Sequence, residues 1–356
     1  MEPYDVVLIQ SPCQVVRNID ERDAQIKRNI KRITELIGWV FNRVGEARLV
    51  ATGEYSLFGQ FRPRTVNQWI DIALPVPNFA TDLLGQTARK LELYLVAHFL
   101  ERHPAFPNCY FNTTVIIDPR GDIVLTYRKH NGPNNLNVSY TGPGDVYSRF
   151  VEVFGEEALF PVVDTPIGRL GVMVCGDIQY PEVARALALK GAEILIHPDA
   201  SLYRRSQAGW EAMRVARAAE NKVYLLSCNT ASFLGTDRPE FGWRGRSQII
   251  SPDGDIMAIA DGPGEAVISA SVDVDRLRWR KTRVAGSGHN YNPTILCRAD
   301  LYAREYQRAN AWPTDAFAEK PLSTTDDARE IARKIIKGQI EAGLLHKPSD
   351  IESTEG

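Results

Sequence analysis

Three polar residues stand where apolar, strand-like segments end, and together they could carry out nucleophilic hydrolysis. Cys175 follows the mainly apolar segment 169–174, and a helix signal, Tyr180-Pro181-Glu182, comes soon after it. Because the unpaired N–H groups at a helix N-terminus stabilise a nearby anion, a thiol at such a junction is expected to favour the thiolate. A lone cysteine is more often a buried structural residue, so its interpretation as a nucleophile depends on its companions.

A cysteine nucleophile needs a proton acceptor, and its substrate needs positive charge where the oxyanion forms. Glu54 can accept the proton if burial favours its protonated form, and Lys129 can hold the oxyanion while favouring the thiolate. The six histidines offer no convincing base, and we expect His130 and His197 to be structural. Polar residues at three strand ends are a stronger signal than any one of them, since sites of α/β proteins assemble there.

The segments that lead to these residues have the periodicities of an α/β protein. A buried strand is predicted at 4–10, a helix at 20–44 from apolar residues at helical spacing, and a strand at 48–52 that ends just before Glu54. This is a βαβ unit, for which a right-handed crossover is expected. The next elements are predicted at 79–91 (helix), 93–100 (strand), and 110–118 and 123–128 (a hairpin that ends at Lys129).

A second round of strands and helices surrounds Cys175. Residues 131–158 precede it and show little periodicity, which in a compact domain indicates a functional or disordered loop. Two sheets with helices on their outer faces would bury the two rounds well. The second round has predicted strands at 159–164, 169–174, 193–197, 223–228, 248–251, 256–260 and 266–272, and helices at 181–190 and 207–221.

The composition is that of a globular protein and argues against several classes. The 356 residues are 44% hydrophobic and 24% charged, and the net charge of −2 lacks the basic excess of a nucleic-acid-binding protein. No apolar segment approaches the roughly 18 residues of a membrane span, and no signal peptide is visible. Five cysteines without paired spacing favour neither a disulfide framework nor a metal site, so we expect a reduced, cytoplasmic protein.

The chain is predicted to divide into a main domain, residues 1–290, and a C-terminal extension, residues 291–356. The extension has one amphipathic segment, 326–342, and little apolar material for a core of its own. We therefore expect it to pack on the main domain or on a partner subunit.

The chain resembles the nitrilase superfamily of carbon–nitrogen hydrolases over roughly residues 4–285. The motifs that carry the resemblance are Gly53-Glu54-Tyr55-Ser56-Leu57, Tyr127-Arg128-Lys129 and Gly171-Val172-Met173-Val174-Cys175-Gly176-Asp177, supported by Tyr180-Pro181-Glu182, Lys190-Gly191-Ala192-Glu193 and Gly245-Arg246-Ser247. The resemblance implies an α/β fold, a four-layer α-β-β-α sandwich, with Glu54, Lys129 and Cys175 as catalytic residues. It also implies a small-molecule amide substrate, a thioester intermediate, no metal or organic cofactor, and a homo-oligomer (dimer or higher).

The Glu54-Tyr55-Ser56 and Gln179-Tyr180-Pro181-Glu182 segments look most like the aliphatic amidase and formamidase branch, in which Tyr55 would border the substrate pocket. Two departures stand out. The second glutamate that the family places after the lysine is Asn137 here, for which Glu152, Glu156 or Glu157 could substitute. Relatives have an aromatic or acidic residue at Gly176, and its loss would enlarge the pocket or relax the turn.

Asp199 follows His197-Pro198 on a strand-end loop that relatives use to line the pocket, so it is a candidate for binding an amine or donor group, with helix capping as the alternative. An amidase that makes a carboxylic acid and ammonia is the leading hypothesis. An N-carbamoyl hydrolase, with Arg204 and Arg205 for a substrate carboxylate, and a nitrilase are the alternatives. A binding protein with impaired chemistry is a third hypothesis, because of Asn137.

Overall fold

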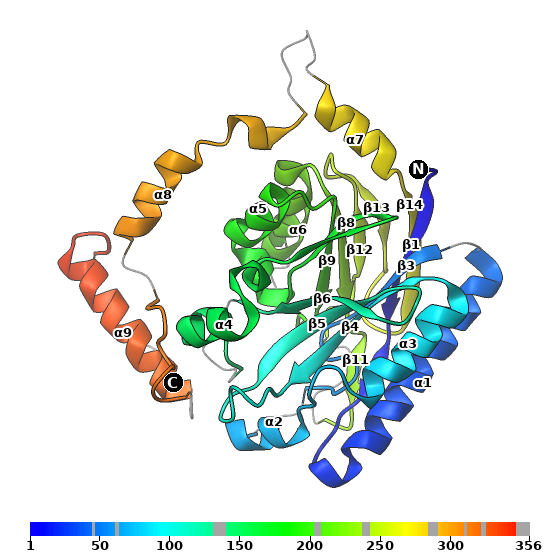
Figure 1. Cartoon of the computed structure of the whole chain (residues 1–356), viewed down its shortest axis with the longest axis horizontal. Helices are drawn as coiled ribbons and strands as arrows, with labels where there is room; N and C mark the ends of the chain where they lie inside the picture. The colour runs from blue at the N-terminus through cyan, green and yellow to red at the C-terminus, as the bar shows by residue number, and fades with distance from the viewer. Residues whose placement is uncertain are drawn as a thin grey trace.

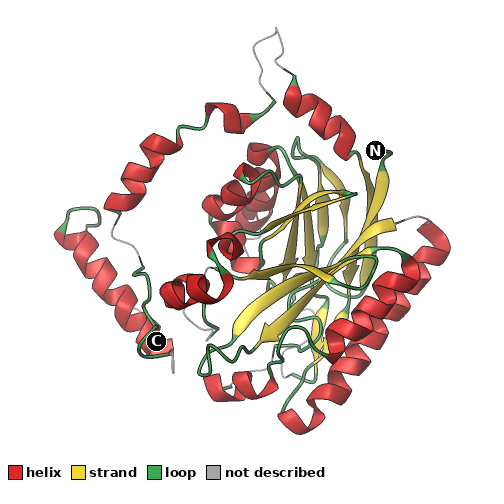
Figure 2. Cartoon of the chain, in the orientation of Figure 1, coloured by secondary structure: helices red, strands yellow, loops and turns green. Residues whose placement is uncertain are grey.

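The computed structural model describes residues 1–44, 47–60, 64–130, 140–202, 208–236, 243–283, 291–309, 312–321 and 325–346. Two six-stranded sheets lie face to face at its centre (Figure 1) (Figure 2). The first, in spatial order, contains β14 (Ala266–Val272), β1 (Tyr4–Gln10), β3 (Ala47–Thr52), β4 (Tyr94–Glu101), β5 (Phe111–Ile117) and β6 (Ile123–Arg128). The second contains β13 (Ile256–Ile259), β12 (Gln248–Ile250), β10 (Tyr224–Asn229), β9 (Ile194–Asp199), β8 (Gly168–Val172) and β7 (Val162–Thr165).

The layers follow from the alternation of side chains along the strands. On β1, Val6 and Leu8 point into the core between the sheets, whereas Val7 and Ile9 pack under the helices on the outer face. Helices α1 (Ile19–Val44) and α3 (Phe79–Leu91) cover the first sheet, and α5 (Pro181–Leu189) and α6 (Ala208–Asn221) cover the second. This arrangement confirms the four-layer α-β-β-α sandwich.

The strand directions bring several strand ends to one edge of the sandwich. Strands β1, β3 and β4 are parallel, and so are β8, β9 and β10. Strand β5 runs antiparallel to β4, and β6 runs antiparallel to β5, so β6 ends on the same side as β3 and β4. Glu54 and Lys129 therefore follow strand ends of the first sheet, while Cys175 and Asp199 lie at strand ends of the second.

Part of the segment predicted as a loop at 131–158 is helical. It contains the 3₁₀-helices η1 (Pro143–Val146) and η2 (Glu156–Leu159) and the helix α4 (Tyr147–Phe154). Helix α4 has eight residues, and Phe150 is its only buried side chain among the described residues, so its sequence shows little periodicity. Its aromatic and β-branched residues also have modest helix propensity. The helix α2 (Val66–Ile72) and the small sheet of β2 (Pro12–Gln14) and β11 (Ser232–Leu234) were not predicted either.

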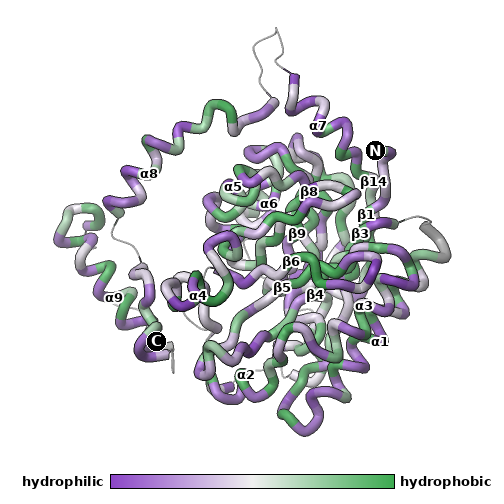
Figure 3. Tube along the Cα trace, in the orientation of Figure 1, coloured by the Kyte–Doolittle hydropathy of each residue, from purple (hydrophilic) through white to green (hydrophobic). Residues whose placement is uncertain are grey.

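The C-terminal region extends away from the sandwich as an arm (Figure 1). After α7 (Val274–Thr282) it contains η5 (Pro293–Leu296), α8 (Ala299–Arg308) and α9 (Thr325–Glu341), along which apolar and polar residues alternate (Figure 3). The arm returns to the body near η1, where the Asp315 N–H donates to the Gly144 carbonyl at 2.9 Å. Among the described helices, none combines the length and apolar character that crossing a bilayer requires.

Candidate active site

Glu54, Lys129 and Cys175 meet where the two sheets end. The Lys129 Nζ lies 2.9 Å from the Glu54 Oε1, and both side chains are buried. The Cys175 sulfur, a Glu54 carboxylate oxygen and an Asp199 carboxylate oxygen lie within 4.8 Å of one another. Four residues from four strand ends, far apart in sequence, thus form one polar cluster, in which Cys175 is half-buried and the other three are buried.

The loop after β3 reaches the second sheet through a close backbone contact at Gly53. A Cβ at this position would lie 2.6 Å from the Thr230 Oγ1 and 2.7 Å from the Thr230 nitrogen, so a larger residue would push the sheets apart. The Thr230 hydroxyl donates to the Glu54 carbonyl at 2.7 Å, and the Glu54 N–H donates to the Asp199 carbonyl at 3.2 Å. The backbone of Glu54 is therefore held by the second sheet, which contributes Cys175 and Asp199.

Cys175 has an unusual backbone conformation at the start of η3 (Cys175–Gln179). Its φ is +44°, a left-handed value that costs a non-glycine residue roughly 1–3 kcal/mol. Asp177 stabilises this turn, because its Oδ2 accepts the Val174 N–H at 2.9 Å and the Tyr127 hydroxyl at 2.7 Å. Strained backbone that neighbours over-determine is typical of functional positions.

The side chain of His197 also stabilises the position of Cys175, by contacting the backbone carbonyl of the cysteine. The His197 Nε2 lies 3.0 Å from the Cys175 carbonyl oxygen, and Nδ1 lies 2.9 Å from the Ser227 hydroxyl. Burial lowers the pKa of His197, so its neutral ring donates from Nε2 to the carbonyl and accepts from Ser227. His197 therefore contacts the backbone of Cys175 through its ring, in agreement with the structural role expected for it.

Two further residues, His98 and Asn112, orient the Glu54 carboxylate. The Asn112 Nδ2 donates to the Glu54 Oε1 at 2.8 Å, and its Oδ1 lies 2.6 Å from the His98 Nε2. Burial lowers the pKa of His98 to about 4, and its Nδ1 accepts the Tyr55 N–H at 3.0 Å, so its Nε2 must carry the proton that Asn112 accepts. Neither residue is predicted from the sequence, although His98 interrupts the apolar run of β4 and Asn112 begins a polar run, Asn112-Thr113-Thr114, inside the fully buried β5.

Replacing Asn112 with Leu should lower kcat for amide hydrolysis about 10- to 100-fold with little change in KM. The substitution keeps the volume but removes a donor to Glu54 and leaves the buried His98 N–H unpaired, which should also cost about 1–3 kcal/mol of stability. Steady-state kinetics and urea unfolding measure the two effects. Thr114→Val, on the same strand and also buried, is a control that should leave kcat within about twofold.

The charges of the site keep the thiol protonated in the free protein. Loss of hydration and the nearby Glu54 carboxylate raise the pKa of the Cys175 thiol, and the Lys129 ammonium offsets only part of this effect. Burial alone would lower the pKa of Lys129, but the adjacent Glu54 carboxylate raises it above its usual range, so Lys129 is a cation. The expectation that the helix N-terminus favours a thiolate is therefore wrong for the free protein, because burial and the neighbouring carboxylates outweigh it.

Asp199 is already occupied by donors from the protein. The Arg214 guanidinium lies 2.5 Å from its Oδ2, Ser201 donates to both carboxylate oxygens at 2.6 Å, and the Trp210 N–H lies 3.3 Å away. Although burial would raise the pKa of Asp199, Arg214 holds it below its usual range. The Glu54, Cys175 and Asp199 side chains are close enough to share a cation, but Lys129 and Arg214 place positive charge beside both carboxylates and oppose one.

Of the other site residues predicted from the sequence, some lie beside the cluster and others fall outside the described residues. Tyr55 is buried against Trp69, His98 and Phe233 and has a φ of +59°, and its hydroxyl lies 3.4 Å from the Asn112 Nδ2. A Cβ on Gly176 would lie 3.9 Å from the Lys129 Cε, so Gly176 borders the cluster and leaves room there. Asn137, Arg204 and Arg205 lie outside the described residues.

The glutamates considered as substitutes for the second family glutamate face solvent. Glu152 pairs with Arg149 at 2.7 Å and is 66% exposed, and Glu157 pairs with Lys190 and is 91% exposed. Glu156 is exposed as well. These three side chains therefore do not reach the buried cluster.

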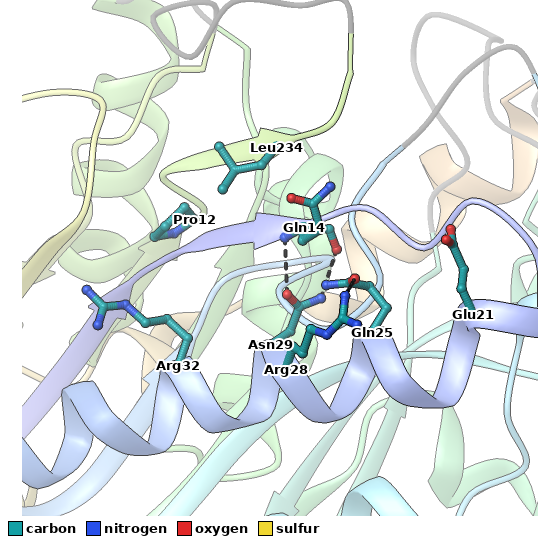
Figure 4. Close-up of a pocket in the computed structure, with 8 residues that line it drawn as sticks. All are labelled: Pro12, Gln14, Glu21, Gln25, Arg28, Asn29, Arg32 and Leu234. Carbon is teal, nitrogen blue, oxygen red and sulfur yellow. Dashed lines mark hydrogen bonds between the residues drawn. The ribbon is translucent and has the colours of Figure 1, made fainter.

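A separate recess lies beside α1, away from the cluster (Figure 4). Gln25, Arg28, Asn29 and Arg32 line it from the helix. Asn29 uses its side chain to hold the backbone of Gln14, and Arg32 pairs with Glu265, so both groups serve the fold. None of the cluster residues lines this recess.

Residues 11–282 match the carbon-nitrogen hydrolase family, and the chain belongs to this family, within the nitrilase superfamily. It is thus a hydrolase that acts on carbon–nitrogen bonds other than peptide bonds. A formamidase of Bacillus thuringiensis is 31% identical over 280 residues, 76% of each chain. Omega-amidase NIT2-B of Xenopus laevis is 30% identical over 207 residues, 58% of this chain and 71% of that protein.

Solved structures agree with the fold. The carbon-nitrogen hydrolase from Helicobacter pylori G27 superposes with a TM-score of 0.65 at 22% identity, covering 86% of this chain and 99% of that one. A variant of the amidase from Nesterenkonia sp. AN1 superposes with a TM-score of 0.59 at 19% identity, covering 85% and 96%. In that variant the acetamide moiety of fluoroacetamide is covalently added at the active-site cysteine.

Proposed function

We propose that the protein is a cysteine-dependent amidase that converts a small carboxamide into a carboxylic acid and ammonia. The observation that carries the proposal is the contact of Lys129 with Glu54 beside the Cys175 sulfur, in a chain of the carbon-nitrogen hydrolase family. The covalent adduct on the cysteine of the Nesterenkonia amidase supports a nucleophilic cysteine in this fold.

In the first half of the reaction, Glu54 takes the proton from the Cys175 thiol as the sulfur attacks the amide carbon. Lys129 stabilises the oxyanion that forms, together with the backbone N–H of Gly176. The carbon–nitrogen bond then breaks, Glu54 gives its proton to the leaving nitrogen, and ammonia departs from a thioester.

In the second half, Glu54 removes a proton from a water molecule, which attacks the thioester carbon. Lys129 again holds the oxyanion, the carbon–sulfur bond breaks, and the carboxylic acid leaves. The proton returns from Glu54 to the Cys175 sulfur, so the starting state is restored. Because the thiol is protonated in the free protein, the first half needs a general base, and the second half needs one to activate water.

The substrate class is a small amide, supported by the formamidase and omega-amidase names of the relatives. Formamide, acetamide, butyramide, glutaramate, an N-carbamoyl amino acid and a nitrile, each assayed for ammonia release, form the deciding panel. We expect turnover of at least one amide and at least about 100-fold lower kcat/KM for the other two classes. Preferred turnover of the N-carbamoyl amino acid or the nitrile would replace the amidase proposal.

Gly176 offers a test of how pocket size sets the choice among amides. Because a Cβ there would meet atoms only at 3.9 Å, Gly176→Ala should keep kcat/KM for formamide within about threefold. Gly176→Phe should reduce kcat/KM for butyramide at least about tenfold more than for formamide, since the ring would occupy space for the longer acyl chain. An equal loss for both amides would show that Gly176 does not limit the acyl group.

We also propose that the arm mediates homo-oligomer formation. Helix α8 has no buried residue, and Leu301, Tyr302 and Tyr306 expose 45–58% of their surface along it. Adjacent η5 exposes Ile295 and Leu296. Large apolar side chains that remain exposed in a monomer are typical of an interface. Sedimentation equilibrium of the full chain should give a mass at least twice that of the monomer, and a monomer at micromolar concentration would refute this.

A further inference from the structure

The nucleophile has a second carboxylate beside it, which the proposed chemistry does not use. Asp199 lies on β9 in the second sheet, and one of its oxygens is within 4.8 Å of both the Cys175 sulfur and a Glu54 oxygen. Two carboxylates this close repel each other strongly in a buried site. Each is matched by a buried cation from another element, Glu54 by Lys129 and Asp199 by Arg214.

The Asp199–Arg214 pair is poorly explained by stability alone. Both side chains are fully buried, and Arg214 comes from α6, where it lies beneath the second sheet. Within the described part of the chain, the Arg214 Nε has no hydrogen-bond partner. Because buried ion pairs are often no more stable than apolar residues of similar volume, a pair with an unsatisfied nitrogen is a costly arrangement. The position of this ion pair beside Cys175 indicates a role at the nucleophile.

We propose that Asp199 is a positioning residue for the nucleophile: its carboxylate, held in place by Arg214, keeps the Cys175 sulfur beside Glu54. The inference rests on the function proposed above for Cys175. Three donors, from Ser201, Trp210 and Arg214, fix the orientation of the carboxylate. An ionised carboxylate can accept the S–H proton in a hydrogen bond, and this orients a side chain that otherwise rotates freely about one bond.

The charges explain why Asp199 orients the thiol while Glu54 takes the proton. Arg214 keeps Asp199 ionised and therefore a weak base, whereas Glu54 is paired with the lysine that also faces the oxyanion. With a neutral thiol, the formal charges of Cys175, Glu54, Lys129, Asp199 and Arg214 sum to zero. Transfer of the proton from Cys175 to Glu54 keeps that sum at zero, so the step creates no net charge in a buried site.

The double variant Asp199→Asn/Arg214→Gln tests the inference, because it removes both charges and leaves no orphan ion. We expect kcat for the best amide to fall about tenfold or more while KM stays within about threefold. Alkylation of Cys175 by iodoacetamide at pH 7 should become at least about threefold faster, since a negative charge beside the sulfur is gone. A change that merely loosened the fold would also speed alkylation and slow turnover, but it would raise KM as well, so the unchanged KM is the readout that identifies a positioning role.

Two outcomes overturn the inference. A large rise in KM with unchanged kcat would assign Asp199 to substrate binding, as the sequence suggested. Unchanged kcat and unchanged alkylation would leave it with no role at the nucleophile. If the wild-type protein turned over no amide, the amidase proposal would fail, but the alkylation rates would still decide whether Asp199 acts on Cys175.

Matched variants separate these effects from loss of the fold. Glu193→Gln/Arg278→Gln removes an ion pair at the opposite end of β9 and should change neither kcat nor alkylation by more than about twofold. If the double variant does not fold, Ser201→Ala removes one anchor of the Asp199 carboxylate without exposing a charge. It should lower kcat about threefold with KM unchanged, and wild-type kcat in this variant would contradict the inference.

Discussion

Replacing Cys175 with Ala should reduce ammonia release from the best amide of the panel by at least about 10³-fold, because no thioester can form without the sulfur. The wild-type protein mixed with substrate and quenched with acid should carry an acyl group on Cys175 in intact-protein mass spectra. The variant should carry none. The adduct is the deciding measurement, because it reports bond formation to the sulfur directly, whereas KM combines substrate binding with the later chemical steps.

The matched control for this substitution is Cys297→Ala. Cys297 is the other partly exposed cysteine, and it lies in the arm beside η5. This variant should keep both turnover and the adduct. Hydrolysis at the wild-type rate by Cys175→Ala would show that Cys175 is not the nucleophile. An acyl adduct on Cys297 would show that Cys297 is the nucleophile instead.

The sequence predicts the elements well and the contacts between them poorly. The predicted bounds of β14, β6 and α3 are those observed, because turn-forming or charged residues flank each of these segments in the sequence. The three strand-end residues were found for a related reason. A polar residue directly after a buried strand is visible in the sequence itself, without knowledge of the strand's neighbours.

The residues that support the cluster depend on pairing that no local pattern reveals. His98 and Asn112 lie on neighbouring antiparallel strands, and their contact requires the register that places Leu100 opposite Asn112. Arg214 reaches Asp199 at the end of β9 from α6, a helix that contacts β10 and β12 of the second sheet. In the sequence, Arg214 is one charged residue of an amphipathic helix, and such residues usually face solvent.

Asp199 illustrates how structure narrows a hypothesis from sequence. The sequence presents a free carboxylate at a strand end, which would suit a substrate amine. In the structure, the same carboxylate has an arginine, a hydroxyl and an indole N–H as partners. A carboxylate that three donors of the protein hold in place, with acceptor capacity left on one oxygen, is suited to orient the neighbouring thiol.

Replacing Glu54 with Gln should lower kcat/KM for amides about 10³- to 10⁴-fold while the site keeps its shape. Lys129 and Asn112 both donate to the Glu54 Oε1, at 2.9 and 2.8 Å, and the amide oxygen of glutamine can accept both hydrogen bonds. The change therefore removes the base and its charge but not the contacts. The expected loss matches what a general base contributes when it acts in more than one step.

An activated ester shows which half of the reaction Glu54 serves. With p-nitrophenyl acetate, the leaving group needs no proton, and solvent can slowly take the proton of the thiol. The glutamine variant should therefore release nitrophenolate slowly, up to once per Cys175, and then stop as an acyl-enzyme. The Asp199→Asn/Arg214→Gln variant retains Glu54, so it should continue to turn over slowly after its burst. If the glutamine variant also turned over steadily, another group would activate water, and Glu54 would serve the first half alone.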